Sequence, residues 1–109
     1  MPINIVKINK EDIDLYSPYS GECIYGETAG DDLGAYENDP TCLFSCFESE
    51  GWGYVSERAR KHLAKKGITD IDNLEPKTVA ELLDFNGVIV FEYNGGFNGT
   101  SWFAFAPAL

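Results

Sequence analysis

The sequence predicts an α+β fold in which a small antiparallel sheet carries two helices packed on one face. Three observations support this fold class. Four apolar runs have the length and residue types of strands, two amphipathic segments carry helix-capping signals, and a glycine-rich loop joins the last two runs as a hairpin. The 109 residues are 44% hydrophobic, which is enough for a hydrophobic core, so we expect a single compact domain over 1–109.

The predicted strands are short and mostly apolar on both faces. Residues 3–8 distribute three isoleucines and a valine over both faces, a pattern typical of a central or covered strand. Residues 42–47 fit a buried strand, with a short helix as the alternative. Residues 88–93 and 100–106 flank the glycine-rich loop at 94–99, and we expect the hairpin they form to lie at the centre of the sheet.

Two helices are predicted, and both are expected on the same face of the sheet. The first covers 56–66, where Ser56 supplies an N-cap oxygen and Gly67 supplies the left-handed residue that closes a helix. Its apolar residues recur every four positions and form a narrow stripe. The second covers 76–86, begins at a proline that is tolerated in a first turn, and ends at an Asn-Gly pair.

The region 20–40 is rich in glycine and acidic residues and is predicted to be mostly loop. Residues 23–25 fit a short strand within it. A further strand or helical turn near 33–36 is the alternative to loop. Before this region, residues 11–16 could form a short helical turn, which the following Ser-Pro pair would end.

Charge is strongly segregated along the sequence, whose formal net charge is −10. From Glu11 to Glu57 there are twelve acidic and no basic residues, whereas five of the eight lysines and arginines lie between Arg58 and Lys66. An ordinary solvated surface mixes both signs, because fields of a single sign are repulsive. Nucleic acids and anionic membranes are disfavoured as ligands, since their phosphates would meet like charge. A basic protein partner fits this pattern.

Composition also indicates a compartment. No stretch reaches the roughly 20 apolar residues of a membrane span, and the start lacks a charged segment followed by an apolar run, so we expect neither a span nor secretion. The cysteines are few and odd in number (Cys23, Cys42 and Cys46), which suits free thiols in a reducing cytoplasm. Asn98 is accordingly expected to be an unused match to the glycosylation pattern.

Catalytic and metal-binding patterns are weak. Cys42 and Cys46 have a spacing seen in zinc sites, but the remaining ligands would have to be Cys23 and His62, from a strand and a basic helix. His62 is also a poor general base for a cysteine nucleophile, because cationic residues on its own helix disfavour an imidazolium. The acidic region lacks calcium-loop spacing, and 94–99 lacks the helix and lysine of a phosphate loop. We expect no cofactor and no metal, with a small metal- or thiol-dependent enzyme as an alternative.

Aromatic residues lie among the acids and are candidate anchors for a partner. Tyrosine and tryptophan often anchor protein interfaces, and the glycines that flank Trp52 would leave its ring accessible. The carboxylates could stand where phosphates would in the groove of a nucleic-acid enzyme and block that groove. The candidate partner-binding residues are Glu22, Tyr25, Glu27, Asp31, Asp32, Tyr36, Glu37, Asp39, Glu48, Glu50 and Trp52.

In size, charge and lack of a catalytic motif the chain resembles phage-encoded anti-restriction and anti-CRISPR inhibitors and the immunity proteins that neutralise nuclease toxins. The resemblance implies a cytoplasmic inhibitor that masks a basic, nucleic-acid-binding protein by electrostatic and steric occlusion, and it assigns no residue a role. A structural or oligomerising phage or accessory protein is the alternative. In that protein the acids would pair with the basic helix at 58–66 of a neighbouring copy.

Overall fold

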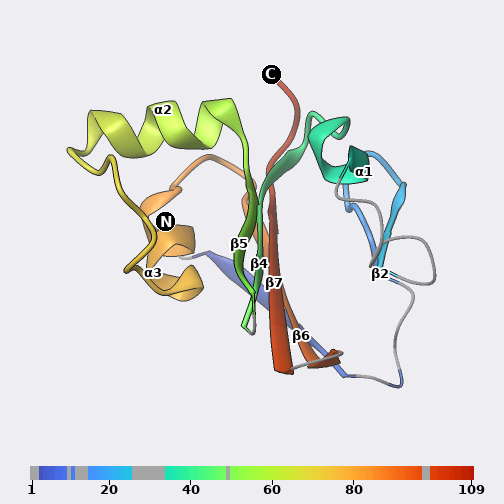
Figure 1. The fold of residues 1–109 in the computed structure, drawn as a ribbon. Helices are drawn as coiled ribbons and strands as arrows, with labels where there is room; N and C mark the ends of the chain where they lie inside the picture. The colour runs from blue at the N-terminus through green and yellow to red at the C-terminus, as the bar shows by residue number, and fades with distance from the viewer. Residues whose placement is uncertain (1–2, 10, 12–14, 26–33, 49, 97–98) are drawn as a thin grey trace.

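The computed structural model describes residues 3–9, 11, 15–25, 34–48, 50–96 and 99–109. Over these residues the fold is α+β, with a mixed five-stranded sheet between two layers (Figure 1). In chain order the elements are β1 (Asn4–Ile8), β2 (Leu15–Tyr16), β3 (Cys23–Tyr25), α1 (Gly34–Glu37), β4 (Cys42–Phe47), β5 (Gly51–Val55), α2 (Glu57–Lys65), α3 (Pro76–Leu82), β6 (Ile89–Gly96) and β7 (Gly99–Phe105). None of these helices has the length and apolar character needed to cross a membrane.

The strand order of the sheet is β1-β6-β7-β4-β5. The β6–β7 hairpin therefore lies in the middle of the sheet, as predicted. The hairpin is longer than expected, because its ladder continues to the pair Gly96 and Gly99 and replaces most of the predicted loop at 94–99. β4, β5, β6 and β7 pair in antiparallel fashion, but β1 pairs with β6 in parallel. The prediction of a wholly antiparallel sheet is wrong for this edge.

β1 is an edge strand, so of the two predicted alternatives, a central or a covered strand, the structure shows the covered one. Its apolar residues on both faces have another cause, since both faces of the sheet are covered. Ile3 and Ile5 pack against the apolar cluster on the helix side, and Ile8 packs against the cluster on the other side. A strand at the edge of a sheet covered on both faces carries the same apolar pattern as a central strand.

The two covering layers differ in composition. α2 and α3 lie over one face of the sheet, and α1 with the β2–β3 ribbon lies over the other (Figure 1). Each layer encloses its own buried cluster. The helix-side cluster consists of Leu43, Phe44, Val55, Ala59, Leu63, Ile71, Val79, Ala80, Leu83, Val88, Val90, Ala104 and Ala106. The ribbon-side cluster consists of Leu15, Tyr36, Cys42, Tyr93, Phe103 and Phe105.

The helices begin where their capping signals indicate. The Ser56 hydroxyl accepts a hydrogen bond from the backbone N–H of Ala59 at 3.2 Å, and Gly67 has a φ of 81° after the helix end. Leu63 is buried at 1% exposure, so the predicted apolar stripe of α2 faces the sheet. α3 ends at Leu82, short of the predicted 86. It ends early because Leu83 leaves helical geometry, with a ψ of 72°.

Three further elements were not predicted as such. β5 has glycine at two of its five positions, so the sequence gives little indication of a strand there. Glycine fits position 53 for a steric reason, because a Cβ on Gly53 would lie 2.7 Å from the Phe47 ring. α1 at Gly34–Glu37 matches the helical turn that is predicted near 33–36 as an alternative to loop. The predicted helical turn at 11–16 is wrong at its described end, where Leu15 and Tyr16 form β2, with the Leu15 side chain in the ribbon-side cluster.

Candidate functional site

A row of residues crosses the helix-side face of the sheet near the β4–β5 turn. The register places Glu92 opposite Trp102, Trp102 opposite Cys46, and Cys46 opposite Trp52. Directly opposed residues point to the same face of a sheet. Two indole rings therefore lie on either side of a cysteine, with a carboxylate beyond the second ring.

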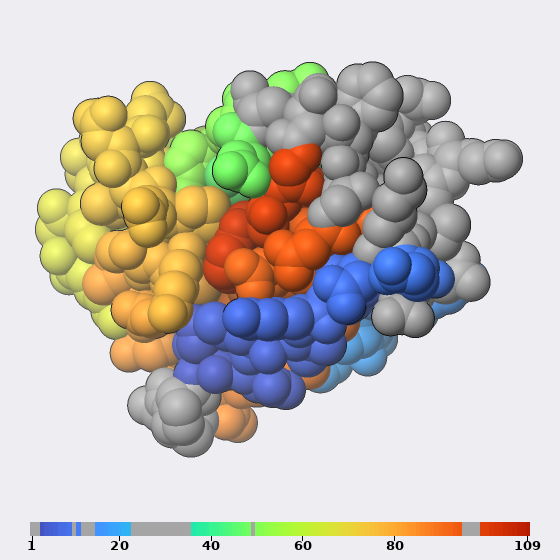
Figure 2. All heavy atoms as spheres, turned by 90° about the horizontal axis from the view of Figure 1, so that it is seen from below, coloured from blue at the N-terminus to red at the C-terminus, as the bar shows by residue number. Residues whose placement is uncertain are grey.

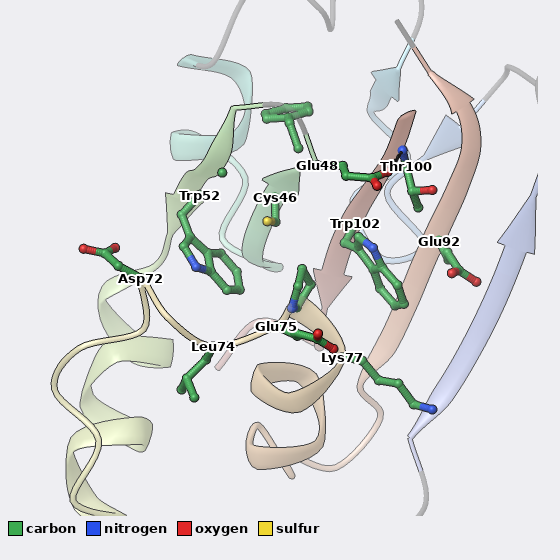
Figure 3. A pocket seen from close by; sticks show the side chains of 13 residues that line it. Cys46, Glu48, Trp52, Asp72, Leu74, Glu75, Lys77, Glu92, Thr100 and Trp102 are labelled. Atoms are coloured by element: carbon green, nitrogen blue, oxygen red, sulfur yellow. Dashed lines mark hydrogen bonds between the residues drawn. The ribbon is translucent and has the colours of Figure 1, made fainter. Parts of the chain in front are cut away.

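The start of α3 and the loop before it lie across from this row and complete a cleft of about 430 Å³, here called the tryptophan cleft. Glu75 and Lys77 extend from the start of α3, Asp72 and Leu74 from the preceding loop, and Glu48 from the end of β4 (Figure 3). Seen from below, the molecule is hollowed between the yellow segment that leads into α3 and the red start of β7 (Figure 2). The cleft thus opens at the end of the sheet that the helices leave uncovered.

Trp52 is held in place by its neighbours. Its indole N–H donates a hydrogen bond to the carbonyl of Ile71 at 3.0 Å. Its ring meets the Phe44 ring edge to face, with 5.2 Å between centroids. The ring is half-buried, so one part is fixed in the core while the rest lines the cleft. A rigid aromatic wall of this kind loses little conformational entropy when a ligand binds.

The charges that line the cleft are unequal, with four carboxylates and a single lysine. Glu48 accepts a hydrogen bond from the backbone N–H of Thr100 at 2.7 Å, which ties the end of β4 to the start of β7. Glu92 lies 3.8 Å from the ammonium of Lys7, whose side chain is 75% exposed, so this pair is loose. Asp72 and Glu75 form no ion pair with any described residue. The cleft is therefore an aromatic hollow with an acidic rim.

The described cysteines are poor nucleophiles. Burial raises the pKa of the Cys46 thiol, at the floor of the cleft, to about 11. Burial, and then the negative charge of Asp39, raise the pKa of Cys42 well above its usual range. Both thiols are protonated at neutral pH, and a thiolate is the form that attacks or binds metal. Among the described residues no group of three histidine, cysteine or acidic side chains is placed to hold a metal ion.

The residues predicted to bind a partner do not form one surface. Glu48, Glu50 and Trp52 belong to the β4–β5 hairpin, and two of them line the cleft. Glu22 and Glu37 are exposed in the layer on the opposite face of the sheet (Figure 1). Four further predicted side chains lie outside the described part of the molecule, namely Tyr25, Glu27, Asp31 and Asp32.

Two of the predicted contacts are buried residues and are corrected here. Tyr36 is only 2% exposed and stacks on Phe103 with 5.6 Å between centroids, so it anchors the ribbon-side layer and is not available to a partner. Asp39 is 5% exposed and accepts hydrogen bonds from the Thr41 backbone N–H at 2.9 Å, the Thr41 hydroxyl at 2.6 Å and the Ser20 hydroxyl at 3.0 Å. It joins the chain after β2 to the start of β4.

We expect Asp39→Asn to lower the free energy of unfolding by about 1.5–3 kcal/mol at neutral pH, the usual contribution of hydrogen bonds to a charged group. Burial alone would raise the pKa of Asp39, but hydrogen bonds from Thr41, Ser20 and Ser17 outweigh it and lower the pKa. A lowered pKa stabilises the folded state above the unfolded pKa, and this stability is lost as pH falls through the folded pKa.

The difference in stability between the wild type and Asp39→Asn should therefore shrink as pH falls below about 4. Urea denaturation at a series of pH values measures this difference. Glu37→Gln is the control, since Glu37 is exposed nearby and should leave stability almost unchanged. A difference that stays constant from neutral pH down to about 2 would contradict the role of the charged carboxylate.

Sequence reasoning missed the residues that complete the cleft: Asp72, Glu75, Glu92 and Trp102. They come from three segments outside the acidic stretch, namely the start of α3 with its preceding loop, β6 and β7, and only strand register and the docking of α3 bring them to Trp52. A local signal existed in Trp102, a large amphipathic ring within an otherwise apolar strand.

Comparison of the chain with protein-family models, curated proteins and solved structures finds no match. Its function is therefore inferred from the cleft and the distribution of charge.

Proposed function

We propose that this protein is a small acidic binding module that inhibits or masks a basic protein partner, by class a nuclease or another nucleic-acid-binding protein of the cytoplasm. The observation that carries the proposal is the tryptophan cleft, which is lined by two half-buried indole rings, four carboxylates and a single lysine. Buried aromatic anchors within a polar rim are typical of the energetic centre of a protein interface. Because the charges on the rim are mostly negative, they favour contact with cationic side chains of a partner.

The internal pairing of charges supports this proposal. Of the described acids between Glu11 and Glu57, Glu57 alone forms an ion pair with a described residue, namely Lys61 at 3.3 Å. The basic helix α2, by contrast, uses several cations internally. Lys66 lies 3.0 Å from Asp84. Negative charge is therefore left uncompensated on this molecule, and a basic partner would gain from it.

The contacts of Arg58 favour a binding module over self-association. Its guanidinium donates hydrogen bonds to the backbone carbonyls of Ala106 and Pro107, each at 2.9 Å, and lies over the Phe85 ring at 5.5 Å. Arg58 thus holds the C-terminal segment against α2 and is not available to the acids of a neighbouring copy. Lys66 is also paired, with Asp84 at 3.0 Å, so two of the five cations between Arg58 and Lys66 are already engaged within the molecule.

The inhibitory mechanism follows from the nature of the partner. A protein that binds nucleic acid presents lysines and arginines where phosphates lie, and carboxylates on a rigid domain can occupy those positions. Long-range attraction steers the encounter, and the aromatic cleft then slows dissociation. Nucleic acid and this protein would compete for one surface, so bound nucleic acid would be excluded.

Salt-dependent capture tests the proposal. The immobilised protein should retain a basic, nucleic-acid-binding protein from a host lysate, and duplex DNA should displace it. The association rate of the purified pair should fall at least about tenfold between about 0.05 and 0.5 M salt, because exposed charges are screened at high ionic strength. Salt-independent binding, or a complex that still binds DNA, would contradict the proposal.

A further inference from the structure

We propose that the tryptophan cleft receives an arginine side chain of the partner protein. The inference rests on the proposed function and gives the cleft a specific ligand group, a guanidinium. The volume of the cleft, about 430 Å³, lies in the roughly 300–1,000 Å³ range of sites that enclose a small ligand. The cleft therefore has room for a whole arginine side chain together with part of its backbone.

The aromatic walls provide the first element of recognition. The face of an indole ring is electronegative and attracts a cation, and guanidinium groups stack on such rings more often than ammonium groups do. Trp52 is fixed by its hydrogen bond to Ile71, so its ring position is set before a ligand arrives. Trp102 is half-buried and lines the cleft, and its indole N–H donates no hydrogen bond to a described residue, so the exposed part of the ring and the N–H can contact the ligand.

The carboxylates provide the second element. Glu75 occupies the N-cap position of α3, yet its side chain makes no capping hydrogen bond and no ion pair with a described residue. In Figure 3 its side chain enters the cleft from the α3 side, across from the indole rings, while Glu92 flanks Trp102. Two carboxylates from different elements thus line the same cleft as Trp102, and a guanidinium has enough N–H groups to bond both.

The uncharged part of the cleft lining favours a guanidinium over an ammonium. It includes the Cys46 thiol on the sheet, which is neutral at physiological pH, and Leu74 and Pro76 on the α3 side. A guanidinium is planar and weakly hydrated, so it loses less solvation than an ammonium when it enters a partly apolar cleft. Lys77 also lines the cleft, but one lysine offsets only one of the four carboxylates, so the net charge of the lining stays negative.

Titration with N-acetyl-arginine amide tests the inference on the wild-type chain of 109 residues. Tryptophan fluorescence and the indole N–H signals in NMR spectra report on occupancy of the cleft. We expect saturable binding at least about tenfold tighter than for N-acetyl-citrulline amide, which has the same shape without the charge. Binding of N-acetyl-lysine amide should be weaker than binding of the arginine derivative. Equal responses to arginine and citrulline, or to arginine and lysine, would overturn the assignment.

A matched pair of variants locates the binding. Glu75→Gln should weaken arginine binding about tenfold, the effect of one charge-assisted hydrogen bond, and should leave the fold intact because the side chain is exposed and caps nothing. Glu81→Gln, at an exposed position of α3 outside the cleft lining, removes the same charge and should change nothing. An identical effect of both variants would overturn the inference, because it would reflect net charge alone.

The outcomes separate this inference from the proposed function. If the arginine derivative fails to bind while a basic partner is still captured in a salt-dependent manner, the assignment of the cleft is wrong and the proposed function stands. If the arginine derivative binds while no basic protein is captured, the proposed function is wrong and the guanidinium chemistry of the cleft is retained.

Discussion

Trp102→Ala is expected to weaken binding of the basic partner by about 2–4 kcal/mol, which corresponds to about 30- to 1,000-fold in Kd. Trp102 stands between Glu92 and Cys46 in the row of residues across the sheet, so its ring forms the central wall of the tryptophan cleft. Tryptophans in this kind of position dominate interface energies, because their large area is desolvated at low entropic cost. Surface plasmon resonance should show the loss mainly in the dissociation rate.

Trp102 also packs against the helix-side cluster, so part of any loss of binding could come from unfolding. Thermal unfolding of Trp102→Ala separates the two effects, since binding is compared only at temperatures where the variant is folded. Trp102→Phe is the matched variant, because it keeps an aromatic face in the cleft and should retain most of the affinity. A folded Trp102→Ala with unchanged Kd would remove the cleft from the interface.

Local signals predicted the α+β class, the two longer helices and four of the five strands of the main sheet. The strand at 42–47 has the same limits in the sequence and in the structure, because a buried apolar run between turn residues carries its own boundaries. The start of α2 follows from Ser56 and the beginning of α3 from Pro76 in the same way. These features depend on neighbours in the sequence, so a single sequence contains the information.

The parallel pairing of β1 with β6 joins residues separated by more than eighty positions, and no local pattern predicts it. β5 was missed because Gly51 and Gly53 have low strand propensity, while its stability comes from pairing with β4. Contacts between residues that are distant in the sequence or on a neighbouring strand determine both the parallel pairing of β1 and the formation of β5. An apolar pattern on both faces of a strand indicated that both faces are covered, and this alone could not distinguish an edge from a centre.

The candidate site was predictable only in part. Glu48 and Trp52 were identified from charge and from flanking glycines, and the structure places both in the tryptophan cleft. Asp39 was misassigned because sequence does not distinguish an acid that is hydrogen-bonded in the interior from one that is exposed. Trp102 and Glu75 were missed because a cleft is a product of strand register and of the docking of α3 on the sheet.

Phe103→Ala is expected to lower the free energy of unfolding by about 3–5 kcal/mol, the usual cost of removing a fully buried phenylalanine. Phe103 is 0% exposed and lies next to Trp102 on β7, with its ring on the opposite face of the sheet. It stacks on Tyr36 with 5.6 Å between centroids and meets the edge of Phe47 at 6.1 Å. Urea denaturation followed by circular dichroism measures the change.

Phe103→Leu is the matched variant and should cost much less, because it preserves most of the buried volume. A loss below about 1 kcal/mol for Phe103→Ala would mean that the layer formed by α1 and β2 contributes little to the stability of the sheet. Where Phe103→Ala is still folded, its Kd for the partner should equal that of the wild type. Trp102 and Phe103, which are adjacent in the sequence, would then separate the two faces of β7 experimentally. The helix-side face would affect binding, and the ribbon-side face would affect stability.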